Sequence, residues 1–339
     1  NSDNQDYHFD LKGFYKTLDS TSDRPLDISI HFNETRINLL EKYLSDIFSD
    51  VDGYANGQLE IAGTPKDLEY LGHADLHDGR LKVDYTNVVY KIPKASINFL
   101  EDRIDFGSLT LEDTLGHTAR LTRGILRHHS FDKMYFDFAM STNNLLVLNT
   151  DGLNNEAYFG KVFAKASMTF TGPMENMVMN IRGEPSDSSD LHIRSGSGRV
   201  SGQADFMVWK VYGKEMKQEA FSKESKLTVY VDVTANNLAN VYVIIDELTG
   251  DIIKANGHGN LKLRATTDGE FTLTGQYDID QGKYNFNFQS LLHKPFTLLK
   301  DAGSYIRWNG NPYDAEIYVV AEYQADNVKF SDLGDQLWL

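Results

Sequence analysis

Two short motifs in the sequence contain residue types that bind cofactors or metal ions. Gly257 and Gly259 form a Gly-x-Gly pair, but the third glycine and the following helix of a dinucleotide-binding motif are absent. His128 and His129 are adjacent in a segment whose alternation predicts a strand, so their side chains point to opposite faces. They cannot bind one metal ion together. We therefore predict a turn at the glycine pair and neither a cofactor nor a metal site.

Paired carboxylates could act as general acid and base. The candidates are the neighbours Glu101 and Asp102 and the neighbours Glu112 and Asp113, each pair at the end of a short predicted strand. Turn formation and solubility are the ordinary roles of acidic residues at such places. The sequence also lacks the HExxH and P-loop motifs and the order of residues typical of a Ser/His/Asp triad. We therefore expect a protein that is not an enzyme.

Composition and charge exclude further classes of function. The chain has 339 residues and no cysteine, and its 33 Lys and Arg against 49 Asp and Glu give a formal net charge of −16. This charge opposes binding to nucleic acid or to an anionic membrane surface. No segment approaches the roughly 20 apolar residues of a membrane-spanning helix. The sequence therefore indicates a soluble domain with no nucleic-acid partner.

Alternation of apolar and polar residues is the dominant pattern, and it is strongest between Gly257 and Tyr323. Apolar residues at every second position predict antiparallel strands with one apolar face. The candidate residues of this face are Leu261, Leu263, Phe271, Leu273, Tyr277, Ile279, Tyr284, Phe286, Phe288, Phe296, Leu298, Ile306, Trp308, Ile317 and Val319. From the pattern alone, the face could form the core of a closed sandwich or remain open to a ligand.

One segment near the amino terminus has a helical pattern. Apolar residues between Ile37 and Phe48 recur at three- and four-residue spacing, and Asn33 or Thr35 could cap the first turn. The polar side carries Glu41 and Asp46 rather than an excess of Lys and Arg. We therefore predict a short amphipathic helix that closes one end of the sheet.

A long imperfect repeat divides the chain. Residues Gly72–Val83 align with Gly275–Phe286, and Ala55–Gly63 upstream resembles Ala255–Ala265. Between the copies, Glu184–Gly202 is rich in Ser, Gly and Asp and is expected to form a loop. The expected organisation is an amino-terminal part with the helix (1–54), a first β module (55–183), a loop-rich charged connection (184–226) and a second β module (227–339).

The same residues carry a resemblance to a known family. The motif G-x-Y-D-x-x-x-G-x-Y-x-F spans Gly275–Phe286, S-x-I-x-W-x-G-x-P-x-D-A spans Ser304–Ala315, and Asn154–Gly160 adds a shorter match. The chain thus resembles the carboxy-terminal domain of the TamB family, the translocation and assembly module of the Gram-negative envelope. The resemblance implies an all-β fold, a long antiparallel sheet curled into a U-shaped β-taco whose apolar inner groove stays accessible.

The resemblance also implies a function and its partners. We expect a periplasmic part of a longer protein that is anchored in the inner membrane and links the inner and outer membranes. Its groove would carry phospholipid acyl chains, or detergent chains in their place, and its partner would be an outer-membrane barrel protein of the TamA type. Two alternatives remain, an assembly factor for outer-membrane β-barrel proteins and a β scaffold with no lipid ligand. The strand pattern at Val328–Leu339 stops abruptly, so we expect further chain or a partner to pair there.

Overall fold

The computed structural model describes residues 7–16, 25–44, 48–64, 67–130, 132–153, 158–195, 210–211, 214–215, 226–288 and 292–324. Its strands are β1 (Phe9–Tyr15), β2 (Leu26–Arg36), β3 (Phe48–Thr64), β4 (Asp67–Val83), β5 (Val88–Leu100), β6 (Arg103–Asp105), β7 (Thr110–Glu112), β8 (Thr118–His129), β9 (Asp132–Thr150), β10 (Tyr158–Pro173), β11 (Asn176–Pro185), β12 (Ser189–Arg194), β13 (Lys210–Val211), β14 (Lys214–Glu215), β15 (Lys226–Ala235), β16 (Ala239–Asp246), β17 (Asp251–Thr266), β18 (Phe271–Phe288), β19 (Leu292–Leu298), β20 (Tyr305–Gly310), β21 (Ala315–Tyr318) and β22 (Ala321–Glu322). The predicted strand at Val328–Leu339 lies outside the described residues.

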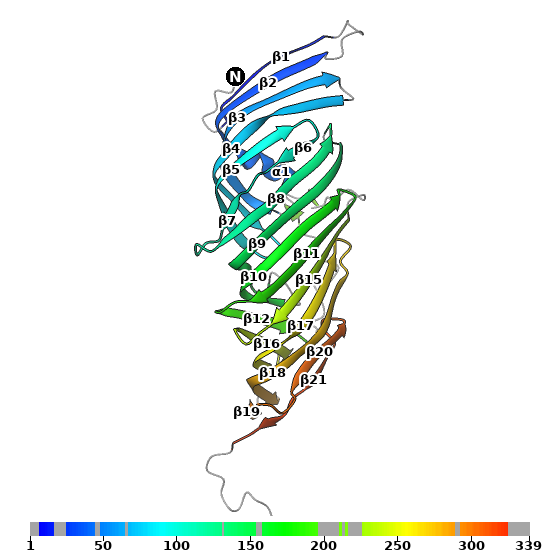
Figure 1. The fold of residues 1–339 in the computed structure, drawn as a ribbon. Helices are drawn as coiled ribbons and strands as arrows, with labels where there is room; N and C mark the ends of the chain where they lie inside the picture. The colour runs from blue at the N-terminus through cyan, green and yellow to red at the C-terminus, as the bar shows by residue number, and fades with distance from the viewer. Residues whose placement is uncertain are drawn as a thin grey trace, which may run out of the picture.

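Twenty of the described strands form one sheet, and the predicted all-β fold is confirmed. From β1 to β10 the chain is an antiparallel meander in which β6 and β7 together fill one position between β5 and β8. The pairs β11–β15 and β12–β16 are parallel, and antiparallel pairing resumes at β17. Figure 1 shows the result, a long narrow body crossed by strands, with β1 at one end and β18 to β21 at the other.

The long strands bend in the middle, so each contributes to two facing walls. On β17 the pairing with β18 shifts register between Asn256 and Gly257, which is the mark of a β-bulge. Ile253 precedes this bend and Leu261 follows it, yet both belong to one buried cluster. The single sheet therefore curls back on itself, as the resemblance implied.

Glycine permits the close approach of neighbouring backbones near the bend. Gly275 on β18 has φ +123°, and a Cβ atom there would lie 2.1 Å from the carbonyl oxygen of Asn260 on β17. Gly72 on β4 has φ +159° and the same conflict with Gln58 of β3. The two glycines occupy equivalent positions of the sequence repeat, and their strands lie in equivalent hairpins. The repeat therefore marks equivalent close approaches of neighbouring backbones in the two hairpins.

The predicted helix over Ile37–Phe48 is wrong in length. The structure has a single turn of 3₁₀ helix, η1 (Ile37–Leu40), then a single α-helical turn, α1 (Glu41–Leu44), and Phe48 already begins β3. Its N-cap is Arg36, which makes no capping hydrogen bond through its side chain. No residue of η1 is buried, so no packed apolar stripe supports a longer helix.

The loop expected over Glu184–Gly202 is also incorrect in part. Ser189–Arg194 forms strand β12, whose Leu191 and Ile193 face the apolar interior. Ser189 is fully buried, and its hydroxyl bonds to the backbone of Phe163. Ser189 and Ser195 are thus buried rather than part of an exposed connection, and residues 196–202 of the expected loop lie outside the described residues.

Candidate functional site: an apolar trough

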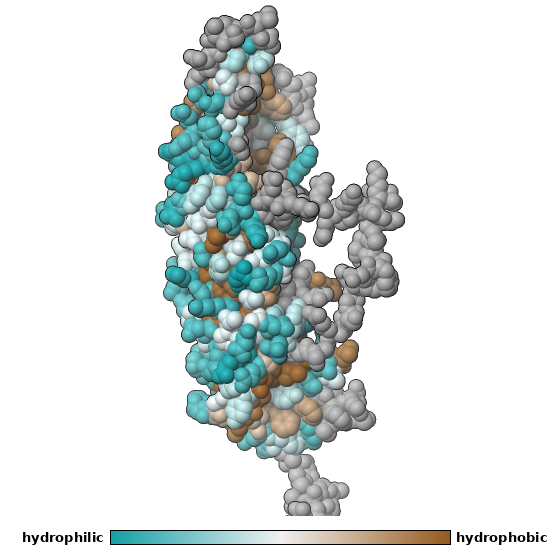
Figure 2. Space-filling model, turned by 90° about the vertical axis from the view of Figure 1, so that its right-hand side faces the viewer, coloured by the Kyte–Doolittle hydropathy of each residue, from teal (hydrophilic) through white to brown (hydrophobic). Residues whose placement is uncertain are grey.

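The inner face of the curled sheet forms an apolar trough along the molecule. In the amino-terminal strands this face is open. Ile28 and Ile30 of β2 are half-buried, whereas Leu11 of β1 is 52% exposed and Phe9 is 40% exposed. Figure 2 shows apolar side chains in the hollow near this end, between more hydrophilic outer surfaces. This open section offers apolar surface that nothing in the described residues covers.

The middle of the trough is lined by aromatic and methionine side chains. The rings of Phe136 and Phe138 on β9 lie 5.0 Å and 6.3 Å from that of Phe170 on β10, and Phe106 lies 5.5 Å from Phe138. All four are half-buried. Half-buried methionines share the same face of neighbouring strands, namely Met134, Met140, Met168 and Met179. Unbranched thioether side chains adapt to ligands of varied shape.

The carboxy-terminal section of the trough is closed because the two walls pack together. Ile193, Val243 and Ile253 from one wall form a single buried cluster with Ile306 and Trp308 from the other. The side chains of Ile306, Ile253 and Val243 have no exposed surface. This section therefore resembles a protein core rather than an open groove.

Two aromatic side chains with polar groups, Tyr277 and Trp308, lie in the closed section. The side chain of Tyr277 is buried, and burial raises the pKa of this phenol well above its usual value. The indole N–H of Trp308 donates to the carbonyl oxygen of Pro312 over 3.2 Å. Apolar contact therefore dominates the closure of this part of the trough.

The predicted groove residues lie mostly in or beside this closed section. Seven are buried there, namely Leu261, Leu273, Tyr277, Ile279, Leu298, Ile306 and Trp308. Four half-buried residues pack against them, namely Leu263, Tyr284, Ile317 and Val319. Phe286 and Phe296 form an aromatic group with Tyr284, Phe271 contacts Tyr158, and Phe288 is the last residue of β18.

Sequence reasoning missed the accessible part of the trough. Ile30, Phe138 and Phe170 lie on the open or half-buried inner face, yet the sequence motifs drew attention only to residues after Gly257. Apolar and polar residues also alternate in Leu26–Phe32 and Phe136–Met140. This alternation could have identified Ile30 and Phe138 as residues of the inner face.

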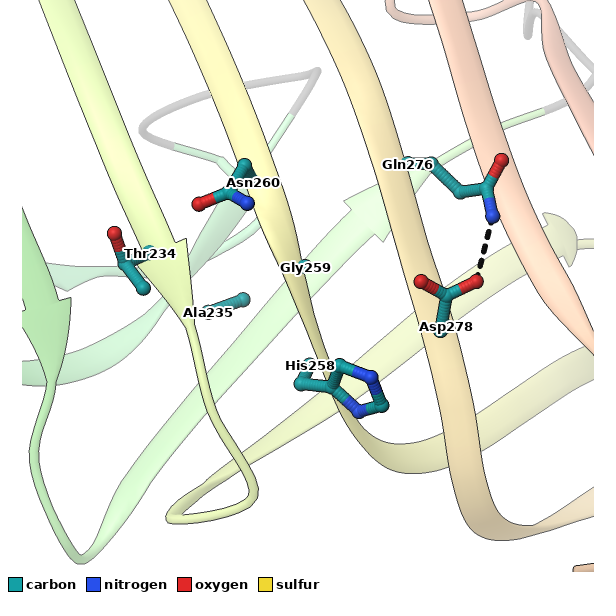
Figure 3. A pocket seen from close by; sticks show the side chains of 7 residues that line it. All are labelled: Thr234, Ala235, His258, Gly259, Asn260, Gln276 and Asp278. Carbon is teal, nitrogen blue, oxygen red and sulfur yellow. Dashed lines mark hydrogen bonds between the residues drawn. The ribbon is translucent and has the colours of Figure 1, made fainter. Parts of the chain in front are cut away.

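The outer face of the sheet is polar and carries shallow depressions. One depression has a volume of about 400 Å³. Figure 3 shows the residues that line it, namely Thr234, His258, Asn260, Gln276 and Asp278 together with Ala235 and Gly259. The side-chain amide of Gln276 donates to Asp278 over 2.6 Å. His258 pairs instead with Asp280, at 3.1 Å. Within the described residues, no three His, Cys, Asp or Glu side chains are arranged to hold a metal ion.

The adjacent histidines point in opposite directions, as predicted. His128 is 6% exposed and meets Tyr70 edge to face, with ring centroids 6.0 Å apart. His129 is exposed and lies 3.6 Å from Asp67. Burial lowers the pKa of His128, so its imidazole is neutral over a wider pH range than usual. The pair does not form a metal site.

Asp113 has the expected role in a turn, but it is a buried residue rather than a solubilising one. Its carboxylate accepts hydrogen bonds from the backbone N–H groups of Leu146, Leu115 and His117, and the His117 ring nitrogen lies 2.9 Å away. Burial acts to raise the pKa of Asp113, but these hydrogen bonds outweigh it and hold the pKa below the ordinary value. Asp113 therefore joins the β7–β8 turn to β9.

This carboxylate compensates for a short strand. β8 begins at Thr118 and pairs with β9 only as far as Thr142, so Leu146 is beyond its reach. Leu146 is buried in a second apolar cluster that includes Val88, Tyr90 and Phe163. The carboxylate of Asp113 satisfies the Leu146 N–H in place of a neighbouring strand. The arrangement holds the β7–β8 turn against β9.

Comparison with known proteins now supplies the family. No curated protein and no solved structure gives a significant match to this chain. In the described part of the chain, no helix is both long enough and apolar enough to cross a membrane. A family model, described as the TamB C-terminal domain, matches residues 107–335, which cover more than half of the sequence and most of the curled sheet. The chain therefore belongs to the TamB C-terminal domain family.

Proposed function

We propose that this protein is a periplasmic part of the Gram-negative envelope whose trough carries phospholipid acyl chains toward the outer membrane. Its family is associated with the envelope. The observation that carries the proposal is the uncovered apolar inner face, where Leu11 is 52% exposed and Ile30 is half-buried. Exposed apolar patches are a common feature of binding sites, and this supports the proposal.

The sheet favours an acyl chain over an unfolded polypeptide as the occupant of this face. Strands inside the sheet already use their backbone groups in pairing with neighbours on both sides, as β3 does with β2 and β4. A polypeptide lying on that face would bury its own N–H and C=O groups without partners, which costs free energy for each group. An acyl chain has no such groups.

Energetics allow movement along the trough. Burying a chain of about 16 methylenes contributes on the order of 10 kcal/mol at roughly 0.8 kcal/mol per methylene. The lipid gives up a similar free energy when the same chain leaves a bilayer, so exchange between bilayer and trough is nearly balanced. Successive apolar side chains such as Ile30, Phe138 and Phe170 would then provide many weak positions rather than one deep pocket.

The proposal extends to the partners and the setting. The chain would act without catalysis, as part of a longer protein anchored in the inner membrane and reaching an outer-membrane barrel protein of the TamA type. The membranes would lie at the two ends of the trough. Assembly of barrel proteins, the alternative role, would use an edge of the sheet such as β1, whose residues are exposed throughout.

Site-specific photo-crosslinking tests the proposal. Benzoylphenylalanine replaces Ile30 or Phe138 on the inner face, and separately His31 or Tyr135 on the outer face, as matched neighbours. The full chain is incubated with vesicles of phosphatidylethanolamine that carries a fluorescent acyl chain, and then irradiated. We expect lipid adducts at the two inner positions and none at the outer ones. Equal labelling of both faces, or none at the inner positions, would refute the proposed function.

A further inference from the structure

One aromatic contact joins the two margins of the trough. Tyr158 is the first residue of β10, and Phe271 is the first residue of β18. Their rings stack with centroids 5.7 Å apart and an interplanar angle of 29°. β10 and β18 are not paired with each other. The strands that lie between them in the sheet are β11 and β12, followed by β15 and β16, and finally β17.

The two residues stand on opposite margins. Tyr158 pairs with Ile193, one residue before the end of β12, beside the β9–β10 turn. Phe271 pairs with Ala265, beside the turn that joins β17 to β18. Both side chains are half-buried and belong to the inner face, because Tyr158 lies opposite the buried Ile193 and Phe271 lies two residues before the buried Leu273. Their stack therefore spans the mouth of the trough.

The stack also marks a boundary along the trough. On its carboxy-terminal side the walls meet in the buried cluster around Ile253, Ile306 and Trp308. On its amino-terminal side the inner face carries a second buried cluster, around Tyr90, Leu146 and Phe163, beside half-buried stretches such as those at Phe138 and Ile30. An acyl chain bound in the open section can therefore move further only if the margins separate.

We propose that Tyr158 and Phe271 form a latch that holds the carboxy-terminal section of the trough closed, and that this section opens to admit an acyl chain from the open section. The latch rests on the proposed transport function. The two walls that the latch keeps together are apolar. When an acyl chain enters, contacts between the walls are therefore replaced by contacts between each wall and the acyl chain, which is also apolar. Among the described residues, the buried cluster around Ile253 and Ile306 is apolar, so opening exposes side chains that the acyl chain itself then covers.

Joining Tyr158 and Phe271 by a covalent bridge tests the proposed latch. The sequence contains no cysteine, so the double variant Tyr158→Cys/Phe271→Cys can be joined specifically by a short, cleavable thiol-reactive crosslinker. Benzoylphenylalanine at position 30, in place of Ile30, reports on lipid in the open section. In place of Leu263, it reports on lipid in the closed section. The probe is again the vesicle that contains fluorescent phosphatidylethanolamine. We expect the bridged protein to be labelled at Ile30 but only at background level at Leu263. Cleaving the bridge should restore labelling at Leu263.

A matched bridge controls for the chemistry. Lys165→Cys and Glu184→Cys face each other on β10 and β11, where the native side chains form an ion pair of 2.8 Å, and bridging them leaves the mouth free. Labelling at both reporter positions should then match that of the unbridged protein. The single variant Tyr158→Ala should increase labelling at Leu263, whereas Tyr158→Phe, which retains the ring, should leave it unchanged.

Three outcomes separate the latch from the underlying function. Labelling at Leu263 that persists in the bridged Tyr158/Phe271 protein would overturn the latch. So would the absence of labelling at Leu263 in every variant that is labelled at Ile30, because the closed section would then be a permanent core. Absence of labelling at Ile30 in the unbridged protein would instead refute the proposed transport function.

Discussion

Replacing Asp113 by alanine should destabilise the fold more than any substitution at an ordinary turn residue. The change removes the acceptor for three backbone N–H groups, of which that of Leu146 is buried and cannot reach water. An unsatisfied buried donor costs about 1–3 kcal/mol, and each of the two turn donors, at Leu115 and His117, loses about 1 kcal/mol. The expected loss of unfolding free energy is therefore about 3–5 kcal/mol, a large share of a typical total.

Urea denaturation followed by circular dichroism measures this loss. Asp113→Asn keeps one acceptor oxygen but turns an N–H₂ group toward existing donors, so we expect an intermediate loss. Glu112→Ala is the matched control, since Glu112 is the neighbouring half-buried residue, and its effect should stay under about 1 kcal/mol. If Asp113→Ala also changed stability by less than about 1 kcal/mol, the carboxylate would not be the substitute strand partner that we describe.

The pH dependence of stability has a definite sign for this residue. The folded-state pKa of Asp113 lies below the ordinary value of 3.8, so the ionised carboxylate stabilises the fold above that pH. The contribution is lost as the pH falls from 3.8 through the lower folded-state pKa. Urea midpoints of wild type and Asp113→Ala should therefore differ at neutral pH and converge in strong acid.

Three further predictions concern other parts of the fold. Ile306→Asp places a charge in the closed section and should abolish the cooperative thermal transition, whereas Ile30→Asp in the open section should leave a cooperative melt. Gly275→Ala should lower the unfolding free energy by about 1–3 kcal/mol in urea melts, because its φ is unfavourable for other residues. Arg36→Gln should raise the pKa of Asp52 from about 2 toward 3.8 in an NMR titration, since the Arg36 hydrogen bond is the main cause of the low value.

The alternation of apolar residues predicted most of the strands and the apolar face. It works because side chains of a strand alternate between faces, and a buried face demands apolar residues whatever the distant partner. The same logic does not distinguish an open face from a closed one. Ile30 and Ile306 occupy the same kind of position in their strands, and only the opposing wall makes one half-buried and the other fully buried.

The failures have separate physical causes. The periodicity of Ile37–Phe48 suits a helix, but Phe48 already pairs with β4 as the first residue of β3. Tertiary pairing here overrides the local preference for a helix. Ser189 appeared to belong to a loop because serine is common there, yet it lies buried at a corner of the sheet. Asp113 could not be recognised because its partner, the N–H of Leu146, is thirty-three residues away.

The central claim is that lipid occupies the inner face of the trough, and lipid mass spectrometry tests it most directly. The full chain is incubated with phosphatidylethanolamine vesicles, separated from them without detergent, and its bound lipid is quantified per chain. We expect bound phospholipid in wild type and in the outer-face control Tyr135→Asp, and a loss of that lipid in the folded inner-face variants Ile30→Asp and Phe138→Asp. Equal lipid content in all four proteins, or no lipid in wild type, would contradict the account.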